Sequence, residues 1–177
     1  MIVVLDSNGL VAWSSSDEVD DDRSRLAHLF EAVSKANGKL IIPTPSLAEY
    51  LVKTDEATAD WLAAIEKKKS IVIGAFDRRA AFECSLLDKS AIGAGDKKGG
   101  RLEPWQKIKV DRQIIAIARV HNADLIVSND GGLRSTAKSV GMKAVEISEL
   151  PLPDAARQAN LPLEPVIEAK ESPRAAG

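Results

Sequence analysis

The chain has 177 residues, of which 45% are apolar and only 4% are aromatic. This length favours a single domain, whose core must consist mainly of Ile, Val, Leu and Ala. With 26 acidic and 24 basic side chains the net charge is −2. This balance excludes a generally basic nucleic-acid-binding protein but permits a local basic path. One cysteine and two histidines exclude an intrachain disulfide and a Cys-rich zinc site, and leave little for a His-based metal site.

The sequence contains no apolar run that approaches the roughly 18 residues a membrane span requires. Its N-terminus has no basic region and meets an acid at Asp6, unlike a signal peptide. We therefore expect no membrane association and a reducing, cytoplasmic setting.

Short apolar segments alternate with amphipathic ones along the chain. Strands are predicted at residues 2–5, 39–42, 71–73, 125–127 and 144–147. Helices are predicted at residues 25–36, from the Thr44-Pro45 pair onward, and at 57–68, 77–88, 111–122 and 133–140. This alternation is typical of βαβ units. The predicted fold is α/β, a three-layer α/β/α sandwich around a five-stranded, mainly parallel sheet.

Two segments depart from this pattern. Residues 94–109 contain three glycines and a proline from Gly95 onward and several cations, and predict a long surface loop. From Pro151 onward the composition turns to Pro, Ala, Glu and Arg. We expect residues 1–150 to form the folded domain, and residues 151–177 to form a tail that is partly disordered or packs as an arm.

Four acidic residues occupy related positions in the predicted sheet. Asp6 ends the first strand, and Glu49 lies about one turn into the helix after the second. Asp111 begins the helix that precedes the fourth strand, and Asp130 follows that strand. Ten helical residues and five strand residues have nearly equal lengths, about 15 Å and 16 Å, so Asp111 and Asp130 should lie at the same edge. Ligands of open α/β sheets bind at this carboxyl edge.

Each acid alone has a simpler explanation as a helix cap, a turn residue or a solvated side chain. Their joint placement is informative, and Asp88, Asp96 and Asp124 do not share it. Converging carboxylates repel one another unless protons or a cation compensate them. All-oxygen ligands select Mg²⁺ or Mn²⁺, and such ions commonly support phosphoryl chemistry. The residues therefore predict a metal-dependent phosphodiesterase.

Four segments of the sequence resemble PIN-domain nucleases of the kind found as VapC-type toxins in prokaryotic toxin–antitoxin pairs. They are VVLDSNGLVAW, PTPSLAEYL, VDRQIIAIARVHNADLIVSND and GLRSTAKSVGMKAVEI, and together they cover most of residues 1–147. The resemblance places the catalytic and metal-binding quartet of the family on Asp6, Glu49, Asp111 and Asp130.

The resemblance also assigns supporting positions. Ser128 matches a small hydroxyl residue before the last acid, and Asn8 a polar residue shortly after the first. Many members carry a further Asp at the position where this sequence has Gly132, so the resemblance does not extend to a fifth ligand. The resemblance implies a Mg²⁺- or Mn²⁺-dependent endoribonuclease, often homodimeric, that a cognate antitoxin holds inactive.

Other functions remain open at this point. A PIN nuclease of RNA processing or turnover and a non-catalytic PIN-fold binding module fit the same motifs. A receiver domain requires an Asp directly after the third strand, where Gly74-Ala75-Phe76 stands, and a haloacid-dehalogenase-type phosphatase requires Asp-x-Asp after the first.

The cations of residues 94–109 precede Asp111 and predict a path that guides RNA to the acidic edge. Trp105 among them either stacks on an unpaired base or anchors the loop to the core. The predicted RNA-binding residues are Lys97, Lys98, Arg101, Trp105, Lys107 and Lys109.

Overall fold

The structure is a computed structural model that describes residues 1–15, 20–52 and 56–153. Most of the predicted tail, residues 154–177, lies outside the described residues. Of the segment from residue 151, the described part includes Leu152, which is buried.

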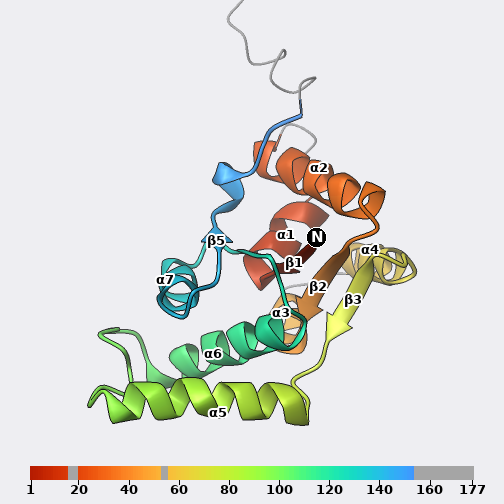
Figure 1. Ribbon diagram of the computed structural model, residues 1–177. Coiled ribbons are helices and arrows are strands. Elements are labelled where there is room, and N and C mark those ends of the chain that lie inside the picture. The colour runs from red at the N-terminus through yellow and green to blue at the C-terminus, as the bar shows by residue number, and fades with distance from the viewer. Residues whose placement is uncertain (16–19, 53–55, 154–177) are drawn as a thin grey trace, which may run out of the picture.

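The centre of the molecule is a five-stranded sheet in the order β3-β2-β1-β4-β5, and every adjacent pair is parallel (Figure 1). The strands are β1 (Ile2–Leu5), β2 (Lys39–Pro43), β3 (Ile71–Gly74), β4 (Leu125–Val127) and β5 (Ala144–Val145). The predicted parallel α/β fold is confirmed. The last strand is shorter than predicted, because the backbone N–H of Ile147 donates to Asn129 Oδ1 and Ile147 begins the 3-10 helix η1 (Ile147–Glu149).

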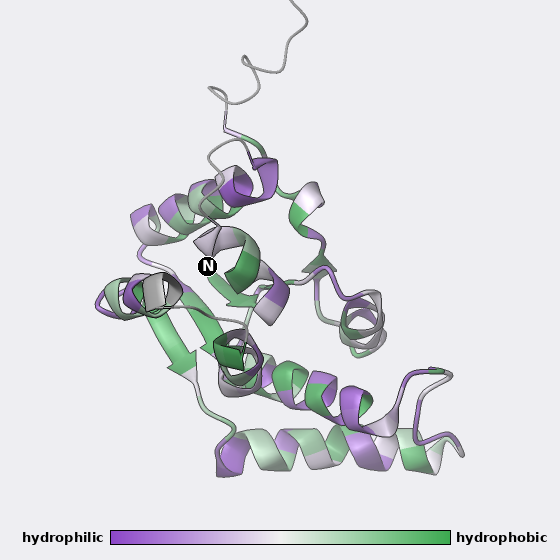
Figure 2. Ribbon diagram, turned by 180° about the vertical axis from the view of Figure 1, so that it is seen from behind, coloured by the Kyte–Doolittle hydropathy of each residue, from purple (hydrophilic) through white to green (hydrophobic). Residues whose placement is uncertain are grey.

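Helices cover both faces of the sheet. The side chains of Val3 and Leu5 pack with α1 (Ser7–Ser14), α2 (Asp21–Lys35) and α4 (Glu56–Glu66), and Tyr50 of α3 (Thr44–Val52) joins them. Val4 points to the opposite face, which α5 (Arg78–Gly93), α6 (Trp105–Val120) and α7 (Gly131–Ser139) cover. Because successive strand residues alternate between faces, each strand contributes to both cores. Figure 2 shows the apolar strands between helices that carry both hydrophilic and hydrophobic residues.

Several helix boundaries differ from the prediction; α5, for example, continues to Gly93 rather than ending at Asp88. Helix α1 was not expected, and Asp6 is its N-cap. Helix α2 begins four residues early, because the side chain of Asp20 accepts a hydrogen bond from the N–H of Asp22 and caps it. Helix α6 begins at Trp105 rather than Asp111, since Pro104 stands at its N-cap and good helix formers follow. The loop before α6 therefore ends at residue 104, not 109. Among the helices of the described residues, none has the length and apolar character needed to cross a membrane.

Candidate active site

The strand order places two of the predicted acids at the topological switch point of the sheet. Strand β1 lies between β2 and β4; the chain passes from β1 through β2 to β3 on one side and then crosses to β4 and β5 on the other. Asp6 follows β1 and Asp130 follows β4, and the N–H of Asp6 donates to the carbonyl of Val127 at 3.1 Å. The crevice at such a switch point is the usual ligand site of open α/β sheets. Asp124, by contrast, binds the N–H of Ile2 at the opposite edge of the sheet.

The Asp6 carboxylate is held by neutral donors. It is only 4% exposed and accepts hydrogen bonds from Ser7 N (2.7 Å), Ser46 Oγ (3.0 Å) and Ser128 Oγ (2.8 Å). Burial raises the pKa of Asp6 above its ordinary value, and the nearby Glu49 adds to this, although the three hydrogen bonds oppose it. Asp6 is therefore a carboxylate whose charge lacks compensation by a neighbouring cation among the described residues.

Glu49 lies beside Asp6 at the rim of the site. It is exposed on α3, six residues into the helix, and its Oε2 accepts a hydrogen bond from Ser7 Oγ at 2.9 Å. Asn8 lies half-buried in the first turn of α1. The structure thus brings Glu49 to Asp6 as expected.

Asp130 is the N-cap of α7. Its Oδ1 accepts from Leu133 N at 2.9 Å and its Oδ2 pairs with Lys107 Nζ. Burial alone would raise the pKa of Asp130, but Lys107 and the backbone N–H groups outweigh burial and hold the pKa below its ordinary value. Ser128 Oγ accepts from the N–H of Asp130 at 3.0 Å while it donates to Asp6. One hydroxyl therefore links the two strand-end acids.

Asp111 completes the acidic group from the second turn of α6. Its side chain is buried, and Oδ2 accepts from Arg101 Nη1 at 2.6 Å. Burial raises the pKa of Asp111 to about 6, Arg101 opposes this rise, and the charge of Asp130 reinforces it. We predicted Asp111 as the first residue of its helix, but the helix begins six residues earlier, at Trp105. Asp111 still lies close enough to Asp130 for the two charges to interact.

The predicted RNA-binding side chains have different surroundings. Lys107 and Lys109 lie on α6 rather than in the loop, and Lys107 pairs with Asp130. Arg101 lies inside the acidic site. Lys98 Nζ donates to the carbonyl of Glu103 at 2.9 Å.

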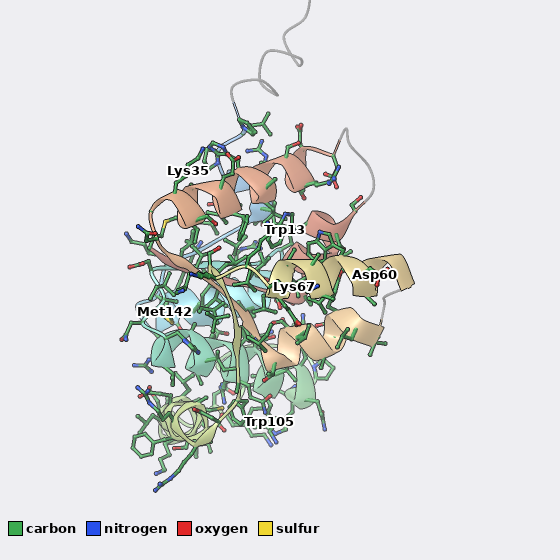
Figure 3. All side chains as sticks on the ribbon, turned by 90° about the vertical axis from the view of Figure 1, so that its right-hand side faces the viewer. Trp13, Lys35, Asp60, Lys67, Trp105 and Met142 are labelled. Carbon is green, nitrogen blue, oxygen red and sulfur yellow. The ribbon has the colours of Figure 1, made fainter. Side chains whose placement is uncertain are left out.

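Trp105 is half-buried between two cations. Its ring centroid lies 5.2 Å from Lys97 Nζ and 5.3 Å from Arg112 Cζ. Figure 3 labels it in the part of the molecule that α5 and α6 form. The contacts fit the anchoring role, in which cation–π attraction holds the start of α6 to its neighbours.

The acids form two groups, Asp6 with Glu49 and Asp111 with Asp130, joined through Ser128. Their carboxylate oxygens fit the preference of Mg²⁺ and Mn²⁺ for hard ligands. Within the described residues no three His, Cys, Asp or Glu side chains lie close enough to hold an ion as they stand. Arg101 and Lys107 bind two of the four carboxylates, so these pairs must open for an ion to bind.

Sequence reasoning missed Ser46 and Glu103. Ser46 lies three residues before Glu49 on α3, and this helical spacing is a signal that could have identified it. Glu103 binds Arg101 Nη2 at 2.9 Å from within the loop, where no periodic pattern marks it.

The fold matches those of chains in two solved VapBC structures. One is VapBC2 from Rickettsia felis bound to a DNA fragment from its promoter, with a TM-score of 0.53 and 17% identity. The other is DNA-bound VapBC from Salmonella typhimurium, with a TM-score of 0.54 and 17% identity. The matches cover 82% and 83% of this chain and 98% of the other chain in each case. No protein-family model matches the sequence, and no curated protein matches it. The resemblance to VapC-type PIN domains is therefore supported at the level of the fold.

Proposed function

We propose that the protein is a metal-dependent endoribonuclease that cleaves RNA phosphodiester bonds with a Mg²⁺ or Mn²⁺ ion held by Asp6, Glu49, Asp111 and Asp130. The observation that carries this proposal is the pair of strand-end acids at the switch point, which Ser128 joins by hydrogen bonds of 2.8 and 3.0 Å. Since the acids gather where α/β sheets bind ligands, and their donors are all oxygens, a divalent cation and a phosphate are the ligands that best fit the site.

The site residues have different roles in the proposed reaction. A bound ion supplies an activated water and stabilises charge on the phosphate. Asp6 is fixed by Ser46 and Ser128, so its oxygens are oriented before any ion arrives. Asp111 lies in a buried environment that favours its protonated form, and it must lose its proton to bind an ion. Lys107 can exchange Asp130 for a phosphate oxygen when RNA binds.

The test is cleavage of labelled single-stranded RNA by purified protein after exhaustive chelation and after Mg²⁺ or Mn²⁺ is restored. We expect cleavage only with the ion. A parallel preparation of Asp111→Asn protein shows whether a contaminating ribonuclease contributes. Metal dependence would be contradicted if the chelated wild-type protein cleaved RNA fully while the Asp111→Asn preparation did not cleave it.

We further propose that the nuclease is the toxin of a toxin–antitoxin pair, with a cognate antitoxin as partner and a homodimer as its state. The shared fold with chains of VapBC structures supports this role. Induced expression should arrest growth, and expression of the Asp111→Asn variant should not. Growth unaffected by the active enzyme would favour the alternative, a PIN nuclease of RNA processing or turnover. The long loop between α5 and α6, an elaboration on a minimal toxin, is the observation that favours this alternative.

A further inference from the structure

Position 132 has no side chain, and other side chains fill the space beside it. A Cβ atom built on Gly132 would lie 2.2 Å from Arg101 Nη2 and 2.6 Å from Glu103 Oε1. These distances are far below van der Waals contact. Two residues of the 94–104 loop therefore occupy the volume that a side chain two positions after Asp130 would enter.

The loop is built to deliver these two side chains. The carboxylate of Asp96 accepts from the N–H groups of Lys98 (2.9 Å) and Gly100 (2.5 Å), which closes a tight turn. Lys98 Nζ then donates to the carbonyl of Glu103. Outside the turn, Arg112 donates to the carbonyl of Lys97 at 2.6 Å and fastens the loop to α6. These bonds fix both sides of the turn. The positions of Arg101 and Glu103 therefore follow from hydrogen bonds within the loop and from the bond between the loop and Arg112 of α6.

Arg101 bridges two carboxylates inside the site. Its Nη1 lies 2.6 Å from Asp111 Oδ2 and its Nη2 lies 2.9 Å from Glu103 Oε1. The Arg101 side chain is 10% exposed, and its buried Nε has no hydrogen-bond partner among the described residues. The Arg101 guanidinium is thus held by two carboxylates although its hydrogen-bond donors are not all satisfied. The place between Asp111 and Glu103 favours a cation.

We propose that Glu103 is a fifth acidic residue of the metal site, which takes the place of the side chain that Gly132 lacks. The proposal rests on the proposed function, because it extends the same site. Glu103 and Asp111 share the positive charge of Arg101 in the metal-free protein, and they share a divalent ion, directly or through its bound water, once Arg101 has moved aside. The Glu103 side chain is 34% exposed and can reorient without breaking the core.

This arrangement gives Glu103 and Arg101 opposite effects on an ion. Removal of the Glu103 charge takes away attraction and leaves Asp111 as the carboxylate that Arg101 binds, beside its 3.4 Å hydrogen bond to Thr136 Oγ1. Removal of the Arg101 charge takes away a competitor and a repulsion. A purely structural role of the pair would instead change both affinities in the same direction.

The test is Mn²⁺ titration of the full chain, followed by calorimetry and by loss of the free-ion electron paramagnetic resonance signal. We expect Glu103→Gln to weaken Mn²⁺ binding about 10-fold, the effect typical of supporting ligands. Arg101→Gln should strengthen it. Glu66→Gln, an exposed carboxylate at the end of α4, is the matched control and should bind as the wild type does.

A second pair of variants separates lost charge from lost folding. Glu103→Ala removes one of the two side chains that a Cβ at position 132 would meet. The other is the flexible end of Arg101, which the proposal already requires to move aside when an ion binds, so Gly132→Asp in that background can place a carboxylate in the same volume. We expect the double variant to regain most of the Mn²⁺ affinity that Glu103→Ala loses, with unfolding midpoints confirming that each protein is folded.

The outcomes distinguish the two proposals. A wild type that binds no Mn²⁺ contradicts the proposed function itself. A wild type that binds Mn²⁺, with a folded Glu103→Gln variant that binds it equally well, overturns the role of Glu103 alone. If Gly132→Asp does not restore Mn²⁺ affinity to folded Glu103→Ala protein, the idea that Glu103 takes the place of a side chain at position 132 is also contradicted.

Discussion

The two ends of the acidic site each bury a carboxylate, but they stabilise its negative charge in different ways. Asp6 and Asp111 are both buried, at 4% and 5% exposure, and burial raises the pKa of each. Asp6 is held by hydroxyl and backbone donors, whereas Asp111 is held by the guanidinium of Arg101. Hydroxyl donors can stay in place when an ion binds, but a cation must leave. In the proposed metal site, the end with Asp111 is therefore the part that has to open, and the end with Asp6 is the part that stays in place.

The largest expected effect is on catalysis. Asp6→Asn and Asp111→Asn should each lower RNA cleavage by about 100-fold or more, because each removes charge worth several kcal/mol to a bound ion. Asp6→Asn should leave the metal-free protein equally stable or more stable, since it relieves a buried charge that no cation of the described residues compensates. Initial rates and urea unfolding curves measure both effects. Cleavage near the wild-type rate by either variant would remove that residue from the site.

The fixed end should depend on Ser128 for stability. Ser128 is fully buried, donates to Asp6 and accepts from the N–H of Asp130. Ser128→Ala leaves both groups short of a partner and should cost about 1–3 kcal/mol in the free energy of unfolding. Ser135→Ala, on the exposed side of α7, is the control and should change little. Equal stability of the two variants would show that the hydroxyl does not support this end.

The positions of the acids and of their partners also differ in how far the sequence could predict them. Asp6 and Asp130 follow apolar strands, and parallel strands end at a common edge, so their proximity could be predicted. Asp111 lies near Asp130, as expected, although its helix begins earlier, since a shift of the helix start along its own axis does not move the residue. Arg101 and Glu103 come from a loop whose path depends on hydrogen bonds of Asp96 and Arg112. No periodic pattern encodes such a path, so the partners of Asp111 could not be predicted.

The Asp111 end should respond to pH in the opposite sense to an ordinary ion-paired acid. The pKa of Asp111 is about 6 in the folded protein against an ordinary value of 3.8, so the folded state binds its proton more tightly. Its contribution favours folding below about pH 4 and is lost as pH rises to about 6. The stability difference between wild type and Asp111→Asn should therefore shift against the wild type over this window. Urea unfolding from pH 4 to 7 measures it, and a difference independent of pH would contradict the assignment.

Metal affinity should depend on the same Asp111 proton, but it should increase with pH where the stability decreases. Because an ion requires the deprotonated carboxylate, Mn²⁺ affinity should rise as pH increases toward 6 and level off above it. Calorimetry at several pH values tests this expectation, and an affinity that is flat from pH 5 to 7 would speak against it.

The smallest expected effect concerns RNA capture by the exposed cations. Lys97 and Lys109 are both exposed; Lys97 Nζ lies over the Trp105 ring, and Lys109 lies on α6 within electrostatic range of Cys84 on α5. Replacing both with Ala should flatten the dependence of log affinity on log salt by up to about 0.7 per lost phosphate contact. Lys67→Ala with Lys143→Ala gives the same change in net charge elsewhere. RNA affinities and salt slopes that match this control would leave the predicted basic path without a role.

The most direct test of the account is whether the fixed end and the opening end hold the same ion. Mn²⁺ binding should be measured for the wild type, Asp6→Asn, Asp111→Asn and the double variant. We predict that each substitution alone removes most of the affinity and that the double variant is hardly worse, since residues that share one ligand are not additive. If Asp6→Asn binds Mn²⁺ as tightly as the wild type, or if the two losses simply add, the two ends do not form one metal site.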